Sequence, residues 1–160
     1  MSLRPNETTD RPNRIAWPPI IDAAVLAGAW LLERIVPLTM MPESQTLRWA
    51  GWLVAAAGLA IAIAGFGYFQ SIGTPVNPTG QAKTLATGGI YAYTRNPMYL
   101  GTVVAFIGLA FGLGSAWLVI LTLLMPVALR KLAIEREEAY LLRRFGASYE
   151  AYSARVRRWV

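Results

Sequence analysis

The chain has 160 residues, of which 55% are hydrophobic and only 15% charged, and its formal net charge is +6. A soluble protein usually carries about 25% charged residues, so this composition is typical of a single domain lodged in a membrane. Cysteine and histidine are both absent. That absence excludes disulfides, thiol nucleophiles, imidazole acid–base catalysis and zinc sites of the usual kind. Carboxylates, Tyr, Lys, Arg and backbone groups are left for any chemistry.

The first half of the chain predicts two transmembrane helices. Residues 1–18 are polar and rich in proline, which indicates a disordered leader on the cytoplasmic side. The first span is expected at about 19–38 and ends at Pro37. The second is expected at 49–71, where 23 residues carry no charge. A helix of that length crosses a hydrocarbon core about 30 Å thick.

The second half predicts a hairpin of two more spans. Residues 98–129 are 32 residues without a charge, which as one helix would be about 48 Å long and therefore too long for one span. The sequence Gly-Leu-Gly-Ser at 112–115 indicates a turn, with helices at 97–112 and 115–136. The expected fold class is therefore an all-α integral membrane protein with about four transmembrane helices and a cytoplasmic C-terminal helical segment. Residues 19–160 form one domain in this interpretation.

Charge placement gives this topology an orientation, because loops on the cytoplasmic side collect Lys and Arg. With both termini inside, thirteen of the fifteen basic residues lie in the leader, in the loop 72–96 or after residue 129. Only Arg34 and Arg48 fall outside. We therefore expect cytoplasmic N- and C-termini, membrane lipids as partners and no nucleic acid.

Small residues and two carboxylates mark the expected helices. Glycines recur every seven residues at 51, 58 and 65, and a second set of small residues runs from 101 to 112. Such stripes let helices pack closely, either within one bundle or between two copies of the chain. Asp22 and Glu33 are eleven residues apart and so share one face of the first helix. Carboxylates in a membrane segment suggest function, but their places near helix ends favour interfacial anchoring.

The loop 72–96 is the first polar segment with features of a binding site. Its glycines and prolines predict irregular structure, and Gly88 and Gly89 would allow a ligand to approach the backbone closely. Tyr91 and Tyr99 offer aromatic faces near a fixed cation, Arg95. An ordinary interfacial loop with tyrosines and an arginine at the membrane surface is the alternative.

The segment after the fourth helix is the second such feature. Glu137 and Glu138 have no basic residue three or four positions away on the same helix. Their partner would be Arg95, a cationic ligand or solvent. A short helix at 148–160 would carry an aromatic and apolar stripe opposite three arginines, and such a helix lies on an anionic leaflet or closes over the loop. The stripe consists of Tyr149, Tyr152, Val156 and Trp159.

Together these two segments resemble a known family. The sequence TLATGGIYAYTRNPMYLG at 84–101, followed by Glu137-Glu138 and by Phe145-Gly146 with tyrosines after it, is similar to the isoprenylcysteine carboxyl methyltransferase and phospholipid methyltransferase superfamily. The resemblance covers roughly residues 66–160 and implies an integral membrane enzyme that binds S-adenosyl-L-methionine and methylates a lipid-borne acceptor. The Thr-Arg-Asn-Pro sequence at 94–97 resembles a bacterial branch, which implies a bacterial inner membrane.

The resemblance also implies roles for individual residues. Arg95, Glu138 and Tyr99 are the expected catalytic residues. The expected cofactor-binding residues are Gly88, Gly89, Ile90, Tyr91, Asn96, Pro97, Glu137 and Glu138, and no metal is expected. Ile90 stands where the family usually has Pro, and Asn96 where many members have a His near the cofactor.

Methyl transfer from a sulfonium suits a chain without Cys or His, because it needs alignment and electrostatic placement rather than a strong base. The acceptor is expected to be a prenylated carboxylate, a phospholipid amine or a similar lipophilic molecule, and an oligomer is possible. Two alternatives are an NADPH-dependent membrane sterol or enone reductase, which would share an arginine and tyrosine motif, and a non-enzymatic lipid-binding membrane protein.

Overall fold

The computed structural model describes Ile15 and residues 17–38, 44–74 and 82–160. Residues 1–14 and 16 of the expected disordered leader lie outside this range, and its last two residues, Trp17 and Pro18, are helical. The described part is helical, as the sequence predicts. Its elements are α1 (Trp17–Ile35), α2 (Gln45–Ser71), the 3₁₀ turn η1 (Gly89–Ala92), α3 (Pro97–Leu113), α4 (Ala116–Leu129), the π-helical turn η2 (Arg130–Ile134), α5 (Glu135–Phe145) and α6 (Ala147–Arg155).

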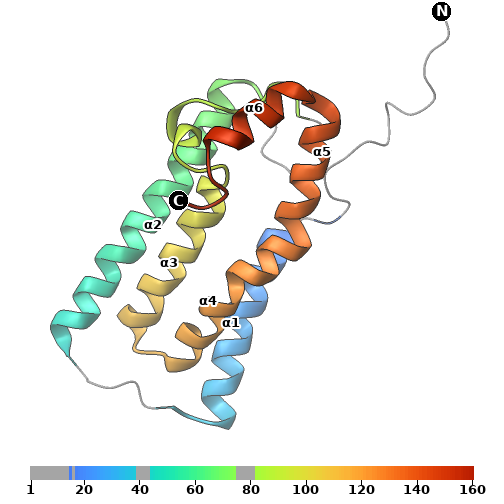
Figure 1. Cartoon of the computed structure of the whole chain (residues 1–160). Helices are drawn as coiled ribbons and strands as arrows, with labels where there is room; N and C mark the ends of the chain where they lie inside the picture. Colours follow the sequence, from blue (N-terminus) through green and yellow to red (C-terminus); the bar gives the residue numbers. More distant parts are fainter. Residues whose placement is uncertain (1–14, 16, 39–43, 75–81) are drawn as a thin grey trace, which may run out of the picture.

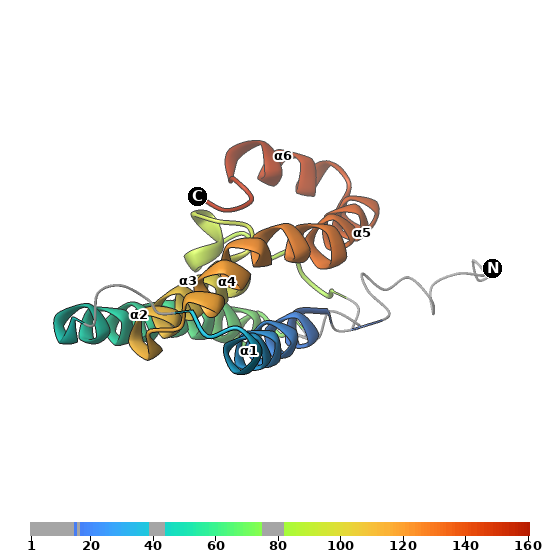
Figure 2. The ribbon, with the colours of Figure 1, turned by 90° about the horizontal axis from the view of Figure 1, so that it is seen from below.

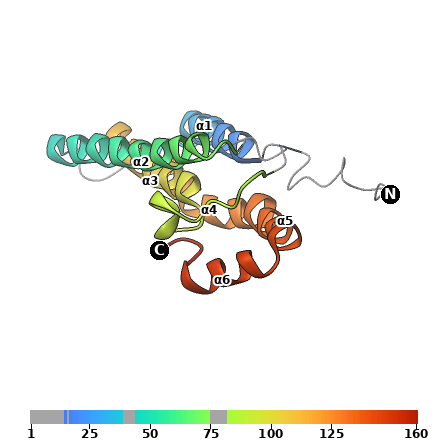
Figure 3. The same cartoon turned by 90° about the horizontal axis from the view of Figure 1, so that it is seen from above.

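Helices α1 to α4 run alongside one another, and α6 lies near one end of them, close to η1 (Figure 1). Views along the helices show α1 and α2 on one face and α6 on the other, with α3 and α4 between (Figures 2 and 3). Among the described residues, α2 and the continuous helix Ala116–Phe145 are long and apolar enough to cross a membrane. Helix α3 is apolar but shorter, and the count of four spans and their orientation stay predictions.

The glycine stripe of α2 is a contact within this bundle. A Cβ atom on Gly58 would lie 2.3 Å from the backbone nitrogen of Ala105, and one on Gly108 would lie 2.2 Å from that of Ala55. The backbones of α2 and α3 therefore touch, and among the described elements this pair of helices makes the most extensive contact. Packing within one chain thus accounts for the small residues that the sequence places at seven-residue spacing.

The turn expected at 112–115 is present. Helix α3 ends at Leu113, Gly114 takes a left-handed conformation with φ of 73°, and the Ser115 hydroxyl oxygen accepts a hydrogen bond from the Leu118 amide at 3.2 Å. The same hydroxyl donates to Glu33 Oε2 at 3.1 Å. Glu33 therefore ties the end of α1 to the start of α4, consistent with an anchoring role near a helix end.

The fourth helix runs past the predicted range 115–136. Instead of ending near residue 136, it continues through η2 and α5 to Phe145. The π-helical turn at Arg130–Ile134 inserts about one residue into the helix, which turns the side chains after it by about 100° relative to an uninterrupted helix. Glu137 and Glu138 come directly after this turn and line a pocket.

The helix expected at 148–160 is shorter than predicted. Helix α6 ends at Arg155, and Val156 is extended, with φ of −114° and ψ of 127°. Residues 157 and 158 instead place their carbonyls against 94–96, where they accept hydrogen bonds from the Arg95 amide and from the Thr94 and Asn96 side chains. Tyr149, Tyr152 and Val156 of the predicted stripe are nevertheless buried together.

Candidate functional site

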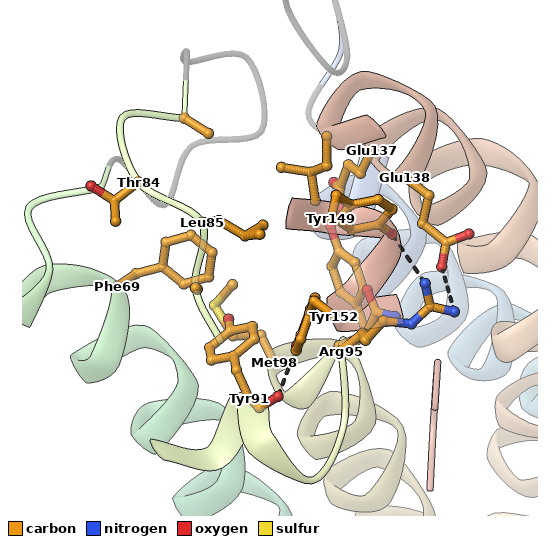
Figure 4. A pocket seen from close by; sticks show the side chains of 15 residues that line it. Phe69, Thr84, Leu85, Tyr91, Arg95, Met98, Glu137, Glu138, Tyr149 and Tyr152 are labelled. Atoms are coloured by element: carbon orange, nitrogen blue, oxygen red, sulfur yellow. Dashed lines mark hydrogen bonds and ion pairs between the residues drawn. The ribbon is translucent and has the colours of Figure 1, made fainter. Parts of the chain in front are cut away.

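A pocket lies where the end of α2, the loop 82–96, the start of α3 and helices α5 and α6 meet (Figure 4). Phe69, Thr84 and Leu85 form one wall, and Glu137, Tyr149 and Tyr152 face them across the open space. The lining residues are Phe69, Ala82, Thr84, Leu85, Ala86, Tyr91, Arg95, Asn96, Met98, Tyr99, Glu137, Glu138, Leu141, Tyr149 and Tyr152. Aromatic rings and three charged side chains therefore share one site.

The loop wall is held by aromatic packing. Tyr91 is buried, and its ring lies 5.1 Å from that of Phe69 in an edge-to-face arrangement and 5.7 Å from that of Tyr68. The Tyr68 hydroxyl accepts a hydrogen bond from the Gly88 amide at 3.0 Å. Because Gly89 has φ of +56° and a Cβ there would lie 2.7 Å from the Tyr68 ring, glycine is required at this turn.

Glu138 lies between two arginines. Arg95 Nη2 lies 3.3 Å from Glu138 Oε1. Arg158 donates from Nε to Oε1 at 2.9 Å and from Nη2 to Oε2 at 2.5 Å, which is a bidentate pair. Arg95 also donates from Nη1 to the Tyr149 hydroxyl at 3.1 Å. The pairing of Arg95 with Glu138 is one of the partners that the sequence suggested, whereas Arg158 was not among them.

Glu137 has a different environment. Its Oε1 accepts a hydrogen bond from the Tyr99 hydroxyl at 2.6 Å. This bond joins α3 to α5 across the floor of the pocket, and it is short because the acceptor is charged. Glu137 also lines the pocket, so this hydrogen bond fixes one of its carboxylate oxygens at the site.

The tyrosines of the site are neutral at physiological pH. Burial raises the pKa of Tyr91, and the neighbouring Tyr152 and Glu137 raise it further. Burial also raises the pKa of Tyr149, and it raises the pKa of Tyr152 to about 12. The hydrogen bond to Glu138 raises the pKa of Arg158, which stays charged. The phenols therefore act as hydrogen-bond donors and aromatic surfaces rather than as bases.

Two buried polar atoms of the site have no protein partner within the described part of the chain. They are the Tyr91 hydroxyl and Arg95 Nε. The Tyr91 carbonyl, by contrast, accepts a hydrogen bond from the Tyr152 hydroxyl at 2.8 Å. Buried polar groups are normally paired, so both atoms are available to a bound ligand.

The structure brings six of the predicted site residues to the pocket: Tyr91, Arg95, Asn96, Tyr99, Glu137 and Glu138. Gly88, Gly89, Ile90 and Pro97 do not line it. The space above the two glycines holds the Tyr68 ring, so the close approach that the sequence suggested is made by this side chain. A cofactor contact at these four residues stays a prediction that the pocket lining does not support.

Several functional candidates were not selected from the sequence. Phe69 lies at the end of an apolar helix, where nothing distinguishes it from other core residues. Tyr149 and Tyr152 belong to a stripe that the sequence placed on a membrane surface or over the loop, but neither was assigned to the site. Arg158 is one of three arginines between 155 and 158, and only its contact with Glu138 separates it from the others.

No group of three or more metal-ligating side chains is present among the residues that the structure describes. The described residues combine long apolar helices with a charged, aromatic pocket at one end of them, which is typical of a membrane protein. The chain belongs to the phospholipid methyltransferase family, whose model matches residues 46–148.

One relative is a protein-S-isoprenylcysteine O-methyltransferase from Schizosaccharomyces pombe. It is 43% identical over 75 residues, which cover 45% of this chain and 30% of the relative. The chain thus matches less than a third of the length of this curated relative. Both comparisons confirm the superfamily that the motifs of the loop and of α5 resemble.

Proposed function

We propose that the chain is an integral membrane methyltransferase that uses S-adenosyl-L-methionine and methylates a lipophilic acceptor. The observation that carries the proposal is the convergence of Arg95, Tyr99 and Glu137 on one aromatic pocket at the end of apolar helices. Family membership supports the reaction class, and the apolar helices support an acceptor that resides in lipid. The soluble cofactor and the lipid-borne acceptor would meet at the membrane surface.

The residues of the pocket fit this cofactor. Its cationic groups match the Glu137 carboxylate and the rings of Phe69, Tyr91 and Tyr149, since a cation over an aromatic face gains about 0.5 to 2 kcal/mol. Its carboxylate and hydroxyl groups match Arg95 Nε and the Tyr91 hydroxyl, which lack protein partners within the described residues. When bound, the cofactor supplies a methyl group on a sulfonium that a nucleophilic acceptor can displace.

The chain's own contribution is to place charges and exclude water. Glu138 is already neutralised by Arg95 and Arg158, so its task is to hold Arg95 rather than to bind a second cation. Glu137 lines the pocket and is the carboxylate that we assign to the ligand, and Tyr99 orients it through the 2.6 Å hydrogen bond. This division refines the expectation that both glutamates act alike.

The acceptor class follows from the same surroundings. The acceptor would enter the pocket from the bilayer. Acceptors that could do so are a prenylated carboxylate, a phospholipid amine or a similar lipophilic molecule. Incubation of membranes containing the chain with labelled S-adenosyl-L-methionine, followed by separation of lipid products, would identify the acceptor. We place the reaction at the cytoplasmic face because thirteen of fifteen basic residues lie in the leader, in the loop 72–96 or after residue 129. The resemblance of the Thr-Arg-Asn-Pro sequence at 94–97 to a bacterial branch supports a bacterial inner membrane.

Calorimetry in detergent tests the cofactor directly. We expect wild type to bind S-adenosyl-L-methionine and Arg95→Ala and Glu137→Gln to bind it at least about tenfold more weakly, because each removes a charged hydrogen-bonding group. Arg136→Ala and Glu150→Gln are matched controls, since both side chains are exposed and outside the pocket. Absence of binding to wild type, or protection from thermal unfolding by NADPH alone, would overturn the proposal.

A further inference from the structure

Residues 156–160, which follow α6, return to the loop that leads into α3. The Arg95 amide donates a hydrogen bond to the Arg157 carbonyl at 3.0 Å. The Arg158 carbonyl accepts from Asn96 Nδ2 at 2.9 Å and from the Thr94 hydroxyl at 3.3 Å. Three hydrogen bonds therefore join this segment to 94–96, a stretch that contributes two residues to the pocket.

The segment is also fixed by packing on both sides. Val156 is buried in a small cluster with Tyr149 and Tyr152, and Trp159 packs against the main core formed by α1, α3 and α4. Figure 1 shows the chain end beside the start of α3. Arg158 lies between these two contacts, and its side chain adds a further contact between the segment and α5.

The Arg158 side chain reaches Glu138 from outside the pocket. Arg158 is not among the lining residues, whereas Glu138 and Arg95 are. Its two nitrogens bind both oxygens of the carboxylate, at 2.9 and 2.5 Å. Arg95 approaches only Oε1, at 3.3 Å. The bidentate contact therefore sets the plane of the carboxylate, and Arg95 takes its position from a group that Arg158 holds.

We propose that Arg158 is a positioning residue for the pocket: it holds Glu138, and through Glu138 it orients Arg95 toward the ligand. The inference rests on the proposed function, because it assigns Arg95 to ligand binding. In the absence of Arg158, Glu138 Oε2 has no other partner in the described contacts, and Arg95 becomes the sole cation for both oxygens. Its guanidinium then turns away from the pocket toward the glutamate.

Arg158→Ala tests this with Arg155→Ala as a matched control. Arg155 is exposed on α6, and its Nε donates only to the Ala151 carbonyl of the same helix, at 3.2 Å. In methyl-transfer assays with lipid extract as acceptor, we expect Arg158→Ala to raise the KM for S-adenosyl-L-methionine roughly tenfold, the lower range for a lost charged hydrogen bond. Its kcat and thermal midpoint should stay close to those of Arg155→Ala.

A conservative variant separates positioning from a general loss of structure. Arg158→Lys keeps the charge but cannot bind both carboxylate oxygens through a planar guanidinium. We therefore expect its KM for S-adenosyl-L-methionine to lie between those of wild type and Arg158→Ala. Equal KM values in Arg158→Ala and Arg155→Ala would overturn the inference. The inference would also be wrong if, in every variant, the KM rose only where the thermal midpoint fell, because a general loss of structure would then explain the change.

Amide hydrogen exchange gives a measurement that does not depend on activity. The Arg95 amide is bonded to Arg157, so release of the segment in Arg158→Ala should speed exchange in a peptide that covers 94–98, and Arg155→Ala should not. Unchanged exchange in Arg158→Ala would contradict the inference. If wild type neither binds S-adenosyl-L-methionine nor transfers a methyl group, the proposed function fails, and the exchange comparison still decides whether Arg158 holds this wall.

Discussion

Two contact regions of the molecule differ in the kind of contact that holds them together. They are the interface between α2 and α3, and the pocket wall where the loop 82–96 meets α5 and α6. In the first, glycines bring two backbones into contact, as at Gly58 and Gly108. In the second, long charged and aromatic side chains span the gap, as between Arg95 and Glu138. In lipid, helices gain little from burying apolar surface, so shape decides their packing. At the bilayer surface, charged hydrogen bonds can hold segments that are too irregular to pack.

The largest effect is expected where the backbones touch. Gly58→Leu would place a Cβ 2.3 Å from the Ala105 nitrogen, and backbone cannot move aside as a flexible side chain can. We expect loss of about 3 kcal/mol or more of stability, above the usual cost of overpacking. Thermal unfolding and yield of detergent-solubilised protein measure it.

Gly67→Leu in the same helix is the control. A Cβ on Gly67 meets nothing within 4 Å, so this variant should keep the thermal midpoint of wild type. Leucine has a higher helix propensity than glycine, so propensity cannot lower the stability of either variant. If both variants lower the thermal midpoint alike, contact with α3 is not the cause, and the contrast between backbone packing and side-chain bonding is wrong for this interface.

A smaller effect, confined to activity, is expected at the Tyr99 hydroxyl. Tyr99→Phe keeps the ring but removes the 2.6 Å hydrogen bond to Glu137 Oε1. A hydrogen bond to a charged group is worth about 1.5 to 3 kcal/mol, so we expect methyl transfer to fall roughly 10- to 100-fold. The assay follows the transfer of label from S-adenosyl-L-methionine to lipid.

Tyr93→Phe is the control for this change, because the Tyr93 side chain is 79% exposed and does not line the pocket. It should retain full activity. Equal rates in Tyr99→Phe and wild type would show that the α3–α5 hydrogen bond is structural. The polar wall would then serve the fold alone, as the glycine interface does.

The sequence predicted the apolar part of the molecule more completely than the polar part. Residue spacing defines a helix and its small-residue face locally, so the stripe at 51, 58 and 65 predicted a close contact that the structure contains. The partner of Glu138 depends on side chains 20 and 43 positions away along the chain. Charge alone left Arg95, a ligand and solvent as alternatives.

The prediction of a helix through residue 160 failed for the same physical reason. Apolar residues at 149, 152, 156 and 159 satisfy helical spacing, yet residues after Arg155 bond to 94–96 instead. Gly88 and Gly89 mark a close approach, as the sequence suggested, but the approaching group is the Tyr68 ring. A local pattern identifies such a requirement without identifying the distant group that fulfils it.

The smallest expected effect lies where the loop is tied to α5. The Tyr140 hydroxyl accepts a hydrogen bond from the Ala82 amide at 3.0 Å, and Arg144 Nε donates to the Ala82 carbonyl at 2.6 Å. Tyr140 is almost fully buried, whereas Arg144 is exposed. We expect Tyr140→Phe to cost about 1 kcal/mol of stability and Arg144→Ala less, because water replaces an exposed bond more readily than a buried one. Thermal midpoints in one detergent compare them, and a larger loss in Arg144→Ala would show that charge, not burial, holds the loop.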